Sequence, residues 1–257
     1  MCYNENRGDN MENKHVEYKR IVEGADKAVL FIHGILGTPN HFRELIPLVP
    51  ENYSILAMVT PGHCASVSEF SHSSLEKWEQ GVQTAVDELL ENHKEVYIVG
   101  HSMGTLFAID QAIKDPRVRG LFCLSIPIKV RVRARMIPMA MRIYRNKIKD
   151  DDIVTLALRE CYGCSAEKNI FKYLGWIPRF LDLFKLIRRV RKNLDKLGTP
   201  CVAYQSIPDE LVSPKSVGIL KNESNIKVVS LANSTHFYYA KDEMDFIKKE
   251  FIEFLES

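Results

Sequence analysis

The sequence lacks long apolar stretches, paired-cysteine spacing and low-complexity tracts. Its apolar runs are only a few residues long, whereas a membrane-spanning helix needs about 20. Residues 1–15 are polar and lack the apolar centre of a signal peptide. We therefore expect a mobile N-terminal extension and a cytoplasmic protein. Because 46% of the 257 residues are hydrophobic, the chain can build a packed core.

The six cysteines do not form a disulfide framework in a chain of this length. Cys161 and Cys164 form a single CxxC motif, without a second cysteine pair or a histidine pair nearby. We interpret them as reduced cysteines at the end of a helix. The sequence predicts neither a metal site nor a cofactor.

Short apolar stretches alternate with amphipathic helical patterns. This rhythm is typical of an α/β fold with a mostly parallel sheet covered by helices on both faces. The predicted strands are 16–22, 27–32, 53–59, 96–99, 121–125, 201–205 and 226–231. The predicted helices include 40–48, 75–91, 103–114, 179–194 and 241–255, and a further one begins at Pro214.

The strand pattern stops for about seventy residues after residue 126. Residues 128–136 appear extended and the rest resembles short helices. We expect a core formed by residues 16–126 and 199–257, with residues 127–198 inserted as a helical cap. A cap over the carboxyl ends of the strands would lie where open α/β sheets bind ligands.

A G-x-S-x-G pattern, GHSMG at residues 100–104, lies between a predicted strand and a predicted helix. In this setting the serine stands on a sharp turn, and glycines avoid a collision on either side of it. Gly100 and Gly104 would therefore let Ser102 point into the cleft. An ordinary tight turn is the alternative interpretation.

A serine hydroxyl needs a histidine base and a carboxylate that orients the imidazole. Only His236 follows the insertion, in a loop just past a predicted strand. Asp209 follows the preceding strand, and its neighbour Glu210 is the alternative acid. The order Ser102, Asp209, His236 is the one expected for a nucleophile elbow.

Ester hydrolysis also needs donors for the oxyanion, and each typically contributes about 3 kcal/mol. The backbone N–H of Met103, next to the serine, is the first candidate. The glycine-containing loop HGILG at residues 33–37 supplies the second. We assign it to the N–H of Ile35, with that of Leu36 as the alternative.

These motifs together resemble the α/β-hydrolase superfamily from Val29 to Leu255, in its bacterial carboxylesterase and monoacylglycerol lipase branch. The resemblance is carried by FIHGILGTPNHF, TPGHCASVSEF, YIVGHSMGTLFAI, YQSIPDELVSP and STHFYY. It implies a triad of Ser102, Asp209 and His236 and an oxyanion hole at Ile35 and Met103. One departure is Cys64, which stands where the family usually has glycine in P-G-H-G.

The expected function is hydrolysis of carboxylic esters through an acyl-enzyme, on a small-molecule substrate with an acyl chain. Thioesterase, peptidase, lysophospholipase or acyltransferase activity would use the same triad. A small-molecule receptor on the same fold is the alternative outside enzymes. Nucleic-acid binding is disfavoured, because the basic segment contains few interleaved aromatic residues. The oligomeric state stays open.

Charge is unevenly distributed along the chain. Between Pro127 and Pro200 there are 18 Lys and Arg against 7 Asp and Glu, a balance of +11. Two basic groups stand out: alternating residues of 129–135, and a cluster at 188–192. They form either a solvated face or a platform for coenzyme A, an anionic head group or an anionic lipid surface.

Overall fold

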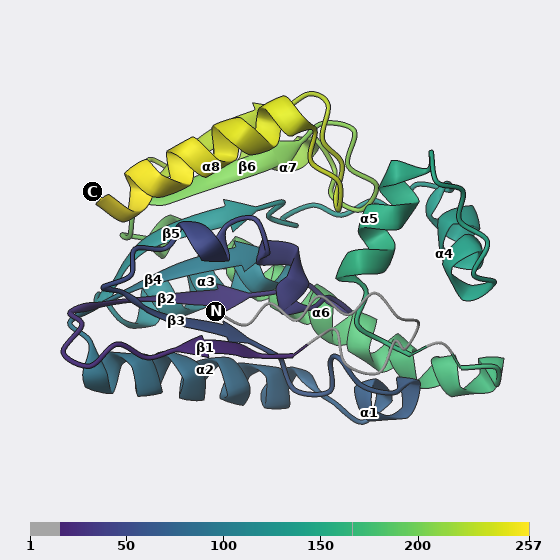
Figure 1. Cartoon of the computed structure of the whole chain (residues 1–257), viewed down its shortest axis with the longest axis horizontal. Coiled ribbons are helices and arrows are strands. Elements are labelled where there is room, and N and C mark those ends of the chain that lie inside the picture. The colour runs from purple at the N-terminus through teal and green to yellow at the C-terminus, as the bar shows by residue number, and fades with distance from the viewer. Residues whose placement is uncertain (1–15, 166, 257) are drawn as a thin grey trace.

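A seven-stranded sheet runs through the centre of the chain, as the computed structural model shows for residues 16–165 and 167–256 (Figure 1). Its order is β1-β3-β2-β4-β5-β6-β7; β1 is antiparallel to β3 and all other neighbours are parallel. The strands are β1 (Tyr18–Arg20), β2 (Lys27–Ile32), β3 (Ser54–Met58), β4 (Glu95–His101), β5 (Val118–Leu124), β6 (Cys201–Ser206) and β7 (Ile226–Leu231).

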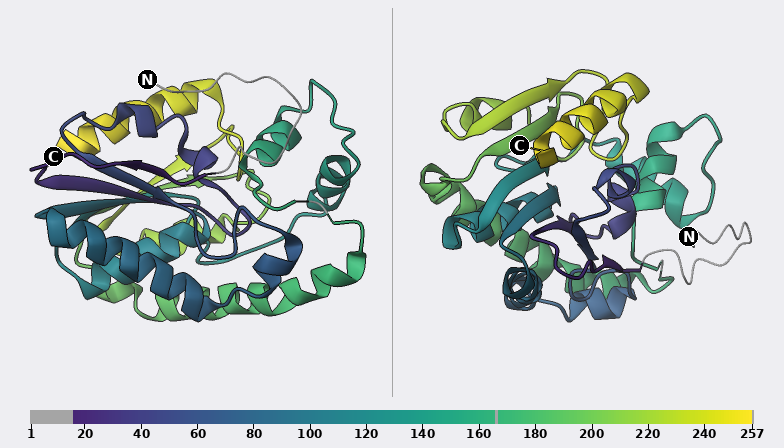
Figure 2. Two further views of the ribbon diagram at one scale, coloured as in Figure 1. Left: turned by 60° about the horizontal axis from the view of Figure 1, so that its bottom comes forward. Right: turned by 60° about the vertical axis from the view of Figure 1, so that its left-hand side comes forward.

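Helices cover both faces of this sheet (Figures 1 and 2). One apolar core joins the sheet to α2 (Leu75–Asn92), α3 (Met103–Lys114) and α6 (Trp176–Lys192). The second core joins the opposite face to α8 (Lys241–Glu256) and the segment around η1 (Pro39–Phe42) and η2 (Ile46–Leu48). The inner strands β2 to β6 are buried on both faces, which explains their continuous apolar sequences, whereas the edge strands β1 and β7 are partly exposed. The predicted α/β-hydrolase architecture is confirmed.

The segment between β5 and β6 contains α4 (Met136–Tyr144), α5 (Ile153–Cys161), η3 (Ile170–Gly175), α6 and η4 (Leu194–Lys196). In both Figures 1 and 2, α4 and α5 lie beyond the carboxyl ends of the central strands. The second half of α6 instead packs into the core beside α2 and α3. Two short helices complete the fold, α1 (Val67–Ser71) and α7 (Lys215–Leu220).

Two local expectations differ from the structure. The helix predicted over 40–48 is two 3-10 helices, η1 and η2. Pro47 contributes to the break, because it has no amide to donate to the carbonyl of Arg43, as one continuous α-helix would require. It stands instead in the first turn of η2, where that donor is not needed. Helix α1 was not expected, although Ser66 and Glu69 cap its start reciprocally in the S-x-x-E pattern.

The predicted N-terminal extension, residues 1–15, lies outside the described residues. Within residues 16–165 and 167–256, none of the helices has the length and apolar character to cross a bilayer.

Candidate active site

Ser102 stands on the turn between β4 and α3. Its φ of 51° and ψ of −118° are rare for a residue with a side chain. Both flanking glycines are required sterically. A Cβ at Gly104 would lie 1.8 Å from the carbonyl oxygen of Ile32, and one at Gly100 would lie 2.7 Å from the Cα of Thr105. The G-x-S-x-G pattern thus allows α3 to start directly against the end of β2.

Asp209 and His236 meet in the loops that follow β6 and β7. The imidazole Nδ1–H of His236 donates to Oδ2 of Asp209 at 2.8 Å, and both side chains are buried. The other carboxylate oxygen accepts from the amides of Leu211 and Val212, each at 2.7 Å. Burial alone would raise the pKa of Asp209, but His236 and these amides outweigh it and lower the pKa.

Ser102 and His236 line the same small cavity, of about 20 Å³, together with Ile35 and Leu211. The loop after β2 closes one side: a Cβ at Gly34 would lie 3.0 Å from the Cβ of Ser102. The structure therefore brings together the serine, the Asp209–His236 pair and the glycine loop, which come from distant parts of the chain.

Two backbone amides are available near the serine. In the turn of residues 34–37, the amide of Gly37 donates to the carbonyl of Gly34 at 2.9 Å, and Leu36 has a φ of 55°. Within the described part of the chain, the amide of Ile35 has no hydrogen-bond acceptor. Met103 is the first residue of α3, where an amide has no partner inside the helix.

Glu210, which the sequence offered only as a rival to Asp209, has a different position. Its Oε2 accepts a hydrogen bond from the backbone amide of His236 at 3.0 Å. Its Oε1 accepts from the guanidinium of Arg135 at 2.6 Å, and the carboxylate is fully buried. Two adjacent acids thus hold one histidine, Asp209 by its ring and Glu210 by its backbone. Their adjacency was the only sequence signal of this second role.

Part of the basic segment is directed inward. Arg131 donates to the carbonyls of Ile207 and Asp209 at 3.2 and 3.1 Å, and Arg135 donates to that of Pro208 at 2.7 Å. The alternating residues 129–135 therefore do not form a uniformly solvated face or an open platform. Their spacing was recognised, but the partners lie about 75 residues away and leave no local signal.

His101 supports the histidine loop from the other side. Its Nε2–H donates to the carbonyl of His236 at 3.0 Å, and its ring stacks on His41 with centroids 3.5 Å apart. Burial and these neighbouring rings hold the pKa of His101 well below its usual range, and burial lowers the pKa of His41 to about 3. Both rings are therefore neutral near pH 7.

The cysteines near the site have the character of unreactive thiols. Burial raises the pKa of Cys161 to about 12, that of Cys164 to about 11 and that of Cys64 to about 12. Cys64 has a φ of 55°, a conformation that glycine adopts without strain. Across residues 16–165 and 167–256, no group of three His, Cys, Asp or Glu side chains could hold a metal ion.

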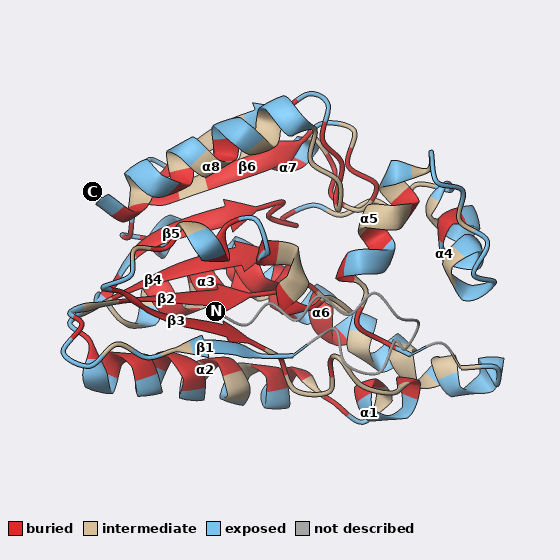
Figure 3. Cartoon of the chain, viewed as in Figure 1, coloured by how far each residue is buried: buried red, intermediate tan, exposed pale blue. Residues whose placement is uncertain are grey.

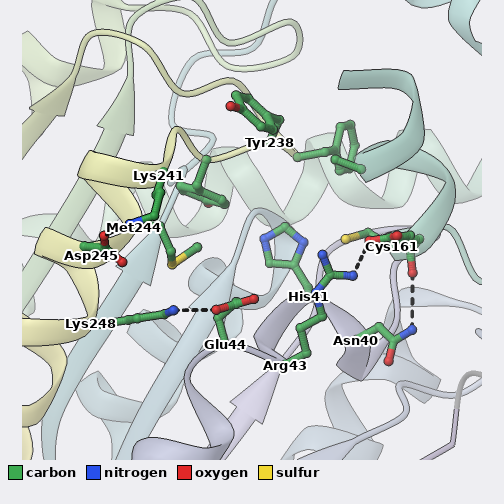
Figure 4. Close-up of a pocket in the computed structure, with 14 residues that line it drawn as sticks. Asn40, His41, Arg43, Glu44, Cys161, Tyr238, Lys241, Met244, Asp245 and Lys248 are labelled. Atoms are coloured by element: carbon green, nitrogen blue, oxygen red, sulfur yellow. Dashed lines mark hydrogen bonds and ion pairs between the residues drawn. The ribbon is translucent and has the colours of Figure 1, made fainter. Parts of the chain in front are cut away.

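A larger pocket, of about 370 Å³, lies between η1, α5 and the start of α8 (Figure 4). It shares His41, Cys161 and Phe237 with the small cavity at Ser102. Its rim carries two ion pairs, Arg43 with Glu160 and Lys248 with Glu44, which Figure 4 marks with dashed lines. The pocket is therefore mixed in charge, and three side chains line both it and the cavity at Ser102.

The family profile described as Hydrolase_4, serine aminopeptidase S33, matches residues 23–238. The chain belongs to this family. The Hydrolase_4 chain is 25% identical over 239 residues to a carboxylesterase of Bacillus subtilis (strain 168), covering 91% of this chain and 94% of that protein. It is 21% identical over 224 residues to a thermostable monoacylglycerol lipase of Bacillus sp. (strain H-257), covering 83% and 84%.

Among solved structures, this Hydrolase_4 chain matches one described under LipS and LipT, two metagenome-derived lipolytic enzymes. The TM-score is 0.73 at 16% identity, with 95% of this chain and 98% of the other covered. At that identity the match shows the fold. The resemblance to the carboxylesterase and monoacylglycerol lipase branch of the α/β-hydrolases is confirmed.

Proposed function

We propose that this protein hydrolyses carboxylic esters through an acyl-enzyme on Ser102. The observation that carries the proposal is the 2.8 Å contact of Asp209 with His236, beside a cavity that His236 shares with Ser102. Likeness to a carboxylesterase and a monoacylglycerol lipase supports an ester as substrate. The family description names an aminopeptidase, so an amide substrate is the matched alternative.

The proposal gives each group a role. Because Nδ1–H of His236 is bound to Asp209, Nε2 is the nitrogen that accepts the Ser102 proton. The serine oxygen then attacks the ester carbonyl, and the amides of Ile35 and Met103 stabilise the oxyanion. As the ester C–O bond breaks, His236 returns the proton to the leaving alcohol. Water, deprotonated by His236, then releases the acid and restores the serine.

The segment 127–198 remains our proposal for the cap that selects the substrate. Its contribution to the site is Cys161 of α5, which lines the cavity at Ser102. A cavity of about 20 Å³ holds no more than a water molecule. An ester with an acyl chain therefore requires α5, which carries Cys161, to move, whereas α6 is fixed in the core by Leu186 and Val190.

The proposal is tested by labelling with a fluorophosphonate probe and by hydrolysis of a soluble short-chain ester. Ser102→Ala should lose both labelling and turnover. Ser68→Ala, at an exposed serine in α1, is the matched control and should keep both. Labelling that survives Ser102→Ala would refute the mechanism.

The substrate class is tested separately on the unaltered protein. A panel of monoacylglycerols, lysophospholipids, acyl-CoA esters and aminoacyl amides separates the activities that share this triad. We expect the highest kcat/KM for the carboxylic esters. A preference for aminoacyl amides would overturn the ester assignment while leaving the role of Ser102 intact.

A further inference from the structure

Large apolar side chains are exposed to solvent along η3 and the first half of α6. Single exposed apolar residues are ordinary in proteins, but a contiguous row of them marks an interaction surface. Figure 3 shows the exposed residues at this end of α6. The row and its exposed fractions are Ile170 (69%), Phe171 (73%), Leu174 (61%), Ile177 (56%), Leu181 (54%) and Phe184 (47%).

This row is separate from the face of α6 that serves the core. Leu183, Leu186, Ile187 and Val190 are buried against the sheet layer. The exposed positions 177, 181 and 184 of α6 instead recur at steps of four and three, so they share one outer face of that helix. Ile170, Phe171 and Leu174 continue the row into η3, which leads directly into α6. The first half of α6 is thus apolar on two sides, and only one side is covered.

The same outer face becomes basic farther along the helix. The steps of four and three continue from Phe184 to Arg188 and Arg191, and Lys192 lies beside them. All three cations are exposed, and none forms an ion pair with any described residue. We call residues 170–192 on this side the α6 outer face: apolar in its first part and cationic in its last.

The apolar part lies at the same end of the sheet as the candidate active site. In Figures 1 and 2 the start of α6 extends past the carboxyl ends of the strands, as does α4. Helix α4 also exposes Ile137 (69%), Met141 (40%) and Tyr144 (43%). Most of the exposed large apolar side chains among the described residues therefore belong to the segment 127–198, and the others lie in β1 and its flanks, in the loop after β6 and in α8.

We propose that the α6 outer face is a docking surface for an anionic lipid layer. Its apolar residues would enter the boundary between head groups and acyl chains, while Arg188, Arg191 and Lys192 contact anionic head groups. A second copy fits the face poorly. A parallel pair would oppose like charges, and an antiparallel pair would set cations against the apolar row. This binding goes beyond the proposed function, because it does not require Ser102.

The test is sedimentation of the full chain with vesicles, in the Ser102→Ala background so that lipid is not consumed. Phosphatidylcholine vesicles containing one third phosphatidylglycerol are compared with pure phosphatidylcholine. We expect binding to the anionic vesicles that weakens with salt. Phe184→Glu should weaken it at least tenfold. Phe246→Glu, at a phenylalanine of 43% exposure on α8, is the matched control and should keep it.

A second pair of variants tests the cations. Arg188→Gln with Arg191→Gln should weaken binding to anionic vesicles and reduce its salt dependence, whereas Lys221→Gln, an exposed lysine after α7, should not. Equal binding by Phe184→Glu and Phe246→Glu would overturn the proposal. So would self-association that Phe184→Glu abolishes without any vesicle binding, since that result identifies a second copy as the occupant.

Hydrolysis of a soluble short-chain ester reports on folding and catalysis independently of vesicle binding. With Ser102 intact, Phe184→Glu should hydrolyse a soluble short-chain ester at the rate of the unaltered protein. Absence of fluorophosphonate labelling in the unaltered protein would refute the esterase mechanism but would leave vesicle binding as a separate result. Loss of vesicle binding with normal turnover would refute docking alone.

Discussion

Glu210 holds the backbone of His236, with its Oε2 3.0 Å from the amide nitrogen of that residue. The neighbouring Asp209 holds the ring of the same histidine. Arg135, the residue immediately before α4, donates a hydrogen bond to the other carboxylate oxygen of Glu210. The segment that enters the proposed cap is therefore tied to the histidine loop by one buried carboxylate.

Replacing Glu210 should impair turnover more than substrate binding. In Glu210→Gln the carbamoyl group cannot accept from both the His236 amide and Arg135, so the loop loses one of its constraints. We expect kcat to fall about tenfold to a hundredfold with little change in KM, consistent with misplacement of the base. Steady-state kinetics with a soluble ester measure this split. A rise in KM at constant kcat would contradict a positioning role.

Arg135 provides a paired test with a surface control. Arg135→Gln leaves the buried Glu210 carboxylate without its charged partner, which should cost about 1–3 kcal/mol of unfolding free energy. Arg142→Gln breaks the more exposed pair with Asp152 and should cost about 0–1 kcal/mol. The double variant Glu210→Gln/Arg135→Gln should be less impaired than the sum of the single changes. Additive effects measured by urea unfolding would mean that the two residues act independently.

Asp209→Asn should remove most of the activity while preserving the fold. The asparagine oxygen can still accept from the amides of Leu211 and Val212, so its NH₂ would face the imidazole. That contact favours the tautomer with the proton on Nε2, which cannot accept the Ser102 proton. We expect kcat to fall by about 10³–10⁴, the loss typical of a wrong tautomer. Asp242→Asn, at an exposed position in α8, should leave kcat unchanged. A loss below tenfold would argue against Asp209 as the orienting acid.

Local patterns sufficed for much of the core. Helix α3 and strands β2 and β7 have the predicted bounds, because apolar runs and stop signals such as Asp115-Pro116 act within a few residues. Likewise, the glycines of G-x-S-x-G reflect a steric need that is visible in the sequence itself. The Asp209–His236 contact could be expected from the order of strands, since carboxyl ends of parallel strands meet at one edge.

Contacts between residues far apart in the sequence could not be predicted from such local patterns. The sequence predicted a helix over 179–194 as part of the cap, yet Leu186 and Val190 of α6 pack into the main core, while Phe184 stays exposed. An amphipathic pattern shows that a face is buried but not what covers it. The sequence left Arg131 and Arg135 as part of either a solvated face or an anion-binding platform, because their carbonyl and carboxylate partners lie in the distant loop after β6. The composition of residues 127–200 shows that the segment is basic, but it does not show whether the basic side chains point into the protein or into solvent.

Stability should fall as the pH is lowered from about 6.5 towards 4, partly because of His33. This ring is fully buried, and burial lowers its pKa to about 4. An unfolded histidine has a pKa of about 6.5, so below that pH the unfolded chain binds a proton that the folded chain excludes. The contribution of neutral His33 to the free energy of unfolding is therefore fully present above pH 6.5. It is lost as the pH falls, by up to about 3 kcal/mol at pH 4.

Urea unfolding at a series of pH values measures this slope. His33→Gln should be less stable at pH 7, because His33 accepts from the amide of Thr60 at 3.1 Å. Its free energy of unfolding should nevertheless change less steeply between pH 6.5 and 4, by about 1.4 kcal/mol per pH unit. His72→Gln, at an exposed histidine, should keep the original slope. An unchanged slope in His33→Gln would show that other groups dominate the acid response.

The glycine after Ser102 should tolerate no side chain at all. A Cβ at Gly104 would meet the carbonyl oxygen and carbon of Ile32 at 1.8 and 2.6 Å and the carbonyl oxygen of His33 at 2.9 Å. These are backbone atoms at the end of β2, so relief requires moving α3 away from the sheet and from the loop that carries Ile35. Gly104→Ala should therefore cost more than about 3 kcal/mol of unfolding free energy, at the upper end of overpacking effects.

Gly218→Ala is the matched control, a glycine-to-alanine change at a position where the added methyl group meets no other atom. Gly218 lies in α7, and an added Cβ would have nothing within 4 Å. Alanine is the better helix former, so this variant should gain up to about 1 kcal/mol. Urea unfolding and fluorophosphonate labelling on both variants distinguish a general intolerance to alanine from contact at the serine turn. If Gly104→Ala unfolds at the same urea concentration as the unaltered protein and labels normally, then α3 does not press on β2 as described, and the steric basis for the glycine is wrong.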